Sequence, residues 1–89
     1  MVRYLLTADE KQKMTLSIHG INYSIRTAHS KEQAENIADY VNEKMAEVEK
    51  YQPNLNYRDI AVLAALNISE EYLNLKEEYE QLLEIINEN

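Results

Sequence analysis

The sequence predicts an α+β fold: an N-terminal β-hairpin, one short helix and a long C-terminal helix that forms a dimeric coiled coil. Three patterns lead to this prediction. Apolar and polar residues alternate on both sides of Gly20, apolar residues then recur at helical spacing, and the last third carries a heptad repeat. Oligomerisation also suits the length, because a chain of 89 residues buries a limited core alone.

The alternating segment predicts a hairpin with strands at about Met14–Ile18 and Asn22–Thr27. Gly20 can take the positive φ that a tight turn requires. An isolated two-stranded hairpin is barely stable in water. We therefore expect it to pack on helices or to join a larger sheet.

The first helix is predicted from Ser30 to about Tyr51. Ser30 and Gln33 have the spacing of a capping box, and the proline after Gln52 stops the helix. Its apolar face consists of Ala34, Ile37, Ala38, Val41, Met45 and Val48. The residues expected to be mostly solvated are Glu32, Glu35, Asn36, Asp39, Asn42 and Glu43.

The second helix is predicted from Tyr57 to near Asn89, with Asn56 as its N-cap. A 4-3 heptad stripe runs along it, which is typical of a coiled coil. We call this stripe the seam: Ala61, Ala65, Ile68, Tyr72, Leu75, Tyr79, Leu82 and Ile86. Because the helix is longer than the hairpin and first helix need for cover, we expect the seam to bury itself in a second copy.

The start of this helix is apolar nearly all round, from Ile60 to Leu66, and should therefore be buried all round. Asn67 follows. It is either a buried or half-buried group that fixes the register of two copies, or an amide that reaches water at the edge of the seam. For the whole chain we expect a flexible N-terminal arm (1–13), a globular head (14–66) and a coiled-coil extension (67–89).

Composition excludes several function classes. The 16 acidic and 9 basic residues give a net charge of −7, which disfavours nucleic acid and anionic membranes as partners. There is no cysteine, and His19 and His29 fall in no metal-ligand spacing. No nucleophile stands with a base and an orienting acid, so an enzyme is not expected. The start lacks a signal peptide and no run could span a bilayer, so a cytoplasmic protein is predicted.

Three stretches follow one another along the chain: "LSIHGINYSI", "NIADYVNEKMAEV" and "RDIAVLAALNISEEYLNL", with "VLAALNIS" the most specific. In this order they resemble the bacterial cell-division protein family ZapA. The resemblance covers about Met14 to Tyr79. Residues 1–13 have no counterpart in it, and the coiled coil is shorter than in many relatives.

The resemblance implies a protein that binds FtsZ, the tubulin-like GTPase of the division ring, and that bundles or cross-links its protofilaments at the septum. It also implies dimers or tetramers without enzymatic activity or cofactor. The short coil favours a dimer, with weak further assembly through Leu82, Leu83, Ile85 and Ile86.

The resemblance further places the FtsZ-facing surface on the head, where the candidates are Asn22, Ser24, Arg26, Tyr57, Arg58 and Asp59. For each of them the alternative is an ordinary solvated side chain, with Asp59 complementing the helix dipole. Two other functions stay open at this stage: a generic coiled-coil dimerisation module with another partner, and a small enzyme.

Overall fold

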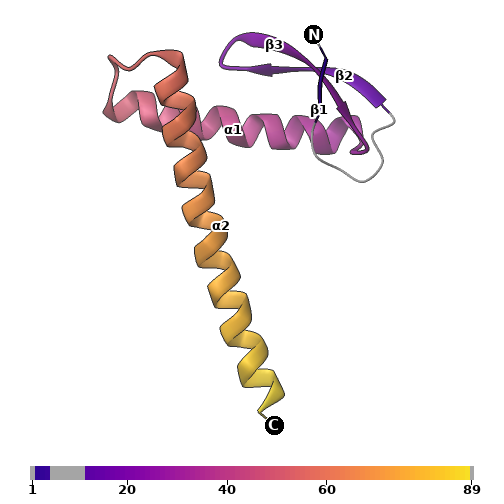
Figure 1. The fold of residues 1–89 in the computed structure, drawn as a ribbon, viewed down its shortest axis with the longest axis vertical. Coiled ribbons are helices and arrows are strands. Elements are labelled where there is room, and N and C mark those ends of the chain that lie inside the picture. The colour runs from indigo at the N-terminus through magenta and orange to yellow at the C-terminus, as the bar shows by residue number, and fades with distance from the viewer. Residues whose placement is uncertain (1, 5–11, 89) are drawn as a thin grey trace. The chain divides into compact units, whose positions relative to one another are not determined.

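The structure, a computed structural model, describes residues 2–4 and 12–88 (Figure 1). Its elements are β1 (Val2–Tyr4), β2 (Gln12–Ile18), β3 (Ile21–Thr27), α1 (Lys31–Tyr51) and α2 (Tyr57–Asn87). The predicted α+β class, with a hairpin followed by two helices, is confirmed. The chain divides into two compact units, residues 1–47 and residues 48–89.

The hairpin pairs β2 with β3 in antiparallel register from Gln12↔Thr27 to Ile18↔Ile21. His19 and Gly20 form the two-residue turn, with φ values of 52° and 77°. Positive φ at both positions is the pattern of a type I′ turn, whose twist matches that of the strands. β2 begins before the predicted Met14 because Gln12 and Lys13 continue the ladder against Thr27 and Arg26.

The sheet has a third strand that the hairpin prediction did not include. β1 pairs in parallel with β3, which gives the strand order β1-β3-β2. The strand lies in the segment predicted as a flexible arm. Residue 1 and residues 5–11 of that segment lie outside the described residues, so the arm stays a prediction.

One face of the sheet packs on α1 in the first unit. The side chains of this core are Leu16, Ala34 and Ala38, with Met14, Ile18 and Ile25 packed against them. Ala34 and Ala38 are buried at this contact. Ile37 lies at the edge of the predicted apolar stripe and is 38% exposed in the single chain.

Both predicted helix caps form. The Ser30 hydroxyl accepts from the Gln33 N–H (3.1 Å), and the Gln33 side-chain oxygen accepts from the Ser30 N–H (3.0 Å). This is the reciprocal capping box. At α2, the Asn56 side chain accepts from the Asp59 N–H at 2.8 Å.

Asn42 ties α1 to the hairpin turn. Its Oδ1 accepts from the His19 N–H (2.7 Å), and its Nδ2 donates to the Ser17 carbonyl (2.8 Å). The expectation that Asn42 is mostly solvated is therefore wrong, because the turn offers a donor and an acceptor that together match a carboxamide. These bonds fix the turn end of the hairpin on α1.

Replacing Asn42 by alanine is expected to lower the free energy of unfolding by about 1–2 kcal/mol, because both turn groups lose a partner. Urea denaturation followed by circular dichroism measures this. Asn36→Ala is the control, since it makes the same gain in helix propensity at an exposed position of α1. Equal effects of the two substitutions would show that the turn contacts contribute nothing.

The second unit contains the end of α1, the connector and α2. Val48, Ile60 and Ala64 are buried. The run from Ile60 to Leu66 is not buried all round in the single chain, since Val62 and Leu66 are exposed. Asn67 is exposed as well. In the single chain, other described residues cover only one face of this apolar segment. The expectation that a second copy covers the rest stays a prediction.

Candidate interaction surfaces

The seam of α2 is largely open to solvent in the single chain. Tyr72, Leu75, Tyr79, Leu82 and Ile86 are between 54% and 65% exposed. Nearer the start of the helix, Ala61 and Ile68 are half-buried and Ala65 is exposed. Every residue from Ser69 to Glu88 is exposed, so nothing in the described chain covers this part of the stripe.

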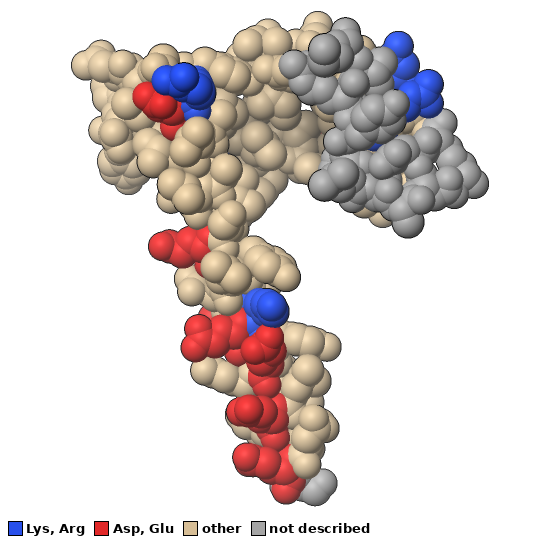
Figure 2. Space-filling view, in the orientation of Figure 1, with Lys and Arg blue, Asp and Glu red and all other residues tan. Residues whose placement is uncertain are grey.

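Charge on α2 is segregated from the apolar stripe. Figure 2 shows the carboxylates gathered along one side of its C-terminal part. A shallow groove of about 410 Å³ lies among the side chains of Tyr72, Leu75, Lys76 and Tyr79. A contiguous apolar strip bordered by charge is the form of a protein interaction surface. Its heptad spacing matches a helical partner.

The first three head candidates lie on one strand. Asn22, Ser24 and Arg26 alternate along β3, on the face opposite to Ile25, which packs into the core. Asn22 is exposed, and the other two are half-buried. Their partners across the ladder are polar too: Ser17, Thr15 and Lys13 respectively. The outer face of the hairpin is thus uncharged near the turn and positively charged at its far end.

The other three candidates lie in the first turn of α2, in the second unit. Tyr57 and Asp59 are half-buried and Arg58 is exposed. Arg58 Nε lies 3.8 Å from Asp59 Oδ1, but its side chain is 84% exposed and such a pair contributes little. The Asp59 carboxylate also complements the helix dipole. The six candidates therefore form two groups of three, one in each unit.

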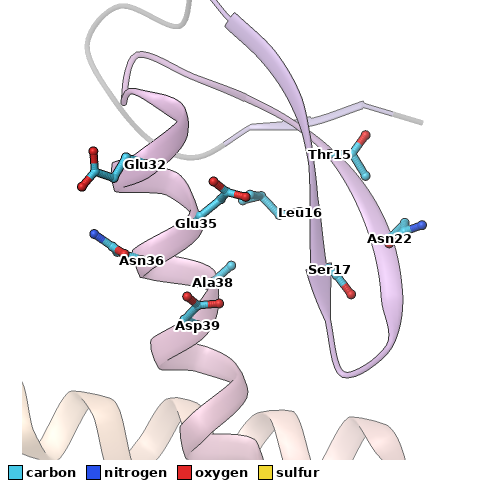
Figure 3. A pocket seen from close by; sticks show the side chains of 9 residues that line it. All are labelled: Thr15, Leu16, Ser17, Asn22, Glu32, Glu35, Asn36, Ala38 and Asp39. Atoms are coloured by element: carbon cyan, nitrogen blue, oxygen red, sulfur yellow. The ribbon is translucent and has the colours of Figure 1, made fainter.

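Sequence reasoning missed a groove between the hairpin and α1 (Figure 3). It has a volume of about 440 Å³ and is lined by Thr15, Leu16, Ser17, Asn22, Glu32, Glu35, Asn36, Ala38 and Asp39. Leu16, Glu35 and Ala38 point into the space between strand and helix. The sequence does contain a signal for the acidic side of this groove. Glu32, Glu35 and Asp39 have i, i+3, i+7 spacing, which places three carboxylates on one helix face.

Among the described residues, no side-chain cluster is placed to form a metal centre. Within residues 2–4 and 12–88, no group of three or more histidine, aspartate or glutamate residues is placed to hold a metal ion. His19 lies in the hairpin turn. His29 lies just before α1, and its backbone N–H donates to Thr27 Oγ1. Neither α1 nor α2 combines the length and apolar character that a membrane span requires.

Comparison with known proteins agrees with the architecture. The family model described as "Cell division protein ZapA" matches residues 14–88. The chain belongs to the ZapA family. The resemblance that the sequence motifs indicated is thus confirmed, and the match extends beyond Tyr79 along α2.

Similar ZapA proteins are 35–39% identical to the chain over the aligned residues. The cell division protein ZapA of Shouchella clausii is 39% identical over 72 residues, which is 81% of this chain and 92% of the relative. That of Geobacillus kaustophilus is 39% identical over 79 residues, covering 89% and 87% respectively. Both names refer to cell division and neither to an enzymatic reaction.

A solved structure gives the same fold. The ZapA mutant dimer from Geobacillus stearothermophilus superposes with a TM-score of 0.71 at 37% identity, covering 93% of this chain and 96% of its own. The chain matched there is part of a dimer. The chain thus combines membership of the ZapA family with a heptad seam on α2 that is exposed in the single chain.

Proposed function

We propose that the chain is a non-enzymatic cell division protein that binds FtsZ and cross-links or bundles its protofilaments at the division ring. The observation that carries this proposal is the exposed seam of α2, from Tyr72 to Ile86, in a member of the ZapA family. The dimeric state of the relative from Geobacillus stearothermophilus supports pairing of two copies, and the exposed seam makes α2 the proposed contact.

Dimerisation supplies the mechanism. A two-fold dimer presents every surface patch of the chain twice. If each copy binds one FtsZ subunit, one dimer joins two protofilaments. Many such weak contacts along a filament add up through avidity, so each contact can stay weak enough for the ring to remodel.

The proposed FtsZ-facing side chains are the two groups described above, on β3 and in the first turn of α2. In this arrangement residues 14–66 act as the head that contacts FtsZ, and residues 67–89 extend the seam as a coiled coil. The proposed location is cytoplasmic, at the division septum, where FtsZ forms the ring. No cofactor enters the proposed activity.

Co-sedimentation with FtsZ polymers tests the proposal. The protein is expected to pellet with FtsZ assembled in GTP but not with FtsZ in GDP, and to increase the amount of FtsZ that pellets at low speed. Protein that remains in the supernatant, at concentrations where it is a dimer, would contradict FtsZ binding. Pelleting of the protein without additional FtsZ would support binding but contradict bundling.

A further inference from the structure

Strand β1 covers part of one edge of β3. Val2, Arg3 and Tyr4 pair in parallel with Ser24, Ile25 and Arg26. The strand is three residues long, and it precedes residues 14–88, which the ZapA family model matches. The edge of β3 therefore accepts a parallel strand that is not part of the matched family domain.

The covered stretch coincides with candidate contact residues. Ser24 and Arg26, two of the three candidates on β3, are direct partners of Val2 and Tyr4. The edge of β3 that pairs with β1 cannot pair with another strand at the same time. Whatever approaches the backbone of β3 from this side must therefore displace β1.

Charge indicates what kind of segment would fit. Lys13 and Arg26 are cross-strand partners on the outer face of the hairpin. Like charges in this position destabilise a sheet unless an anion lies near them. Neither forms an ion pair with a residue of the described chain. In a protein with a net charge of −7, this pair creates a local positive site that suits carboxylates.

We propose that the β3 edge along Ser24–Arg26 is a strand-docking site for an extended acidic segment of FtsZ, and that β1 is the chain's own occupant, which competes with that segment. The inference rests on the proposed function and specifies its contact. An added strand binds through main-chain hydrogen bonds and is selected through alternate side chains. A strand of three residues is short enough to be exchanged, and it lowers the apparent affinity by the fraction of time it occupies the edge.

A disulfide that locks β1 in place tests the competition. The natural chain has no cysteine, so V2C/S24C introduces a single possible bridge. Paired residues on adjacent strands lie within the range that a disulfide spans. The concentration of protein at which pelleting with FtsZ is half-maximal is expected to be about ten times higher for the oxidised sample than for the same sample after reduction.

T15C/S24C is the matched control. Thr15 is the partner of Ser24 across the hairpin, so this bridge alters the same Ser24 side chain but still allows β1 to dissociate from β3. Its oxidised and reduced forms should pellet equally. Equal pelleting of oxidised and reduced V2C/S24C, or an equal loss in both oxidised variants, would overturn the docking site. If the wild-type protein does not pellet with FtsZ at all, the result contradicts the proposed FtsZ binding itself, which is distinguishable from failure of the docking site alone.

Charge reversal tests the acidic character of the docked segment. Lys13→Glu should weaken pelleting severalfold at low ionic strength, and the difference from the wild type should shrink as salt is added. Lys31→Glu makes the same charge change at another exposed lysine of the first unit and should have little effect. Equal weakening by the two variants would overturn the assignment of an acidic segment.

Discussion

Replacing Leu75 by glutamate is expected to leave the protein monomeric at micromolar concentration. Leu75 lies in the middle of the seam and is 65% exposed in the single chain. In a dimer paired through the seam, the glutamate would bury one carboxylate from each copy in an apolar interface. Such burial costs about 3 kcal/mol or more, which raises the dissociation constant by about 100-fold or more. Sedimentation velocity over a dilution series measures the change.

The same variant separates binding from bundling. A monomer carries each head surface once, so Leu75→Glu should bind FtsZ filaments weakly and should not increase the amount of FtsZ that pellets. Asn74→Glu is the matched control, because it adds the same charge at the neighbouring position, outside the seam. An unchanged dimer mass for Leu75→Glu would refute the seam as the dimer interface. A monomer that still bundles FtsZ would refute the cross-linking mechanism.

Features encoded by residues close together in the sequence could be predicted. The capping box of Ser30 and Gln33 and the cap at Asn56 involve residues three apart, and both set helix starts correctly. The hairpin follows from period-two alternation and from a turn that Gly20 permits. The heptad repeat is likewise a local pattern, but the pairing of its seam with a second copy stays a prediction.

Features that depend on distant partners could not be predicted in this way. A three-residue strand such as β1 has too few positions to show a period, and its partner is the third strand of the chain. Asn42 has the sequence environment of a solvated helix residue. Only the folded hairpin brings the Ser17 carbonyl and the His19 N–H within its reach.

The candidate contact residues stay a prediction, but the structure shows how those on β3 are arranged. Sequence reasoning named Asn22, Ser24 and Arg26, and the register shows that they share one face of β3. It did not name Lys13, because residues before Met14 were assigned to a flexible arm. The antiparallel pairing makes Lys13 the direct neighbour of Arg26, so the positive site becomes visible only once the strand register is known.

Replacing Leu16 by alanine is expected to lower the free energy of unfolding by about 3 kcal/mol. Leu16 is 6% exposed and contributes the central side chain of β2 to the core formed with Ala34 and Ala38. Alanines on the helix cannot extend to fill the space that a lost isobutyl group leaves. A cavity should therefore remain beneath the sheet, and its cost adds to the lost transfer energy. Urea denaturation at a fixed protein concentration measures the change, because dimerisation also contributes to stability.

Thr15→Ala is the control for this substitution. Thr15 is the next residue along β2 and is exposed, so its loss should cost less than about 1 kcal/mol through reduced strand propensity. Similar effects at the two positions would mean that the hairpin does not pack on α1 through the Leu16 face. The comparison of Leu16 with Thr15 also tests the orientation of β3. Because Thr15 pairs with Ser24, the two side chains lie on the same face of the hairpin, and that face points away from α1 if Leu16 is the buried residue. A large loss at Leu16 and a small one at Thr15 would thus support the assignment of Ser24 and Arg26 to the outer face, where FtsZ is proposed to bind.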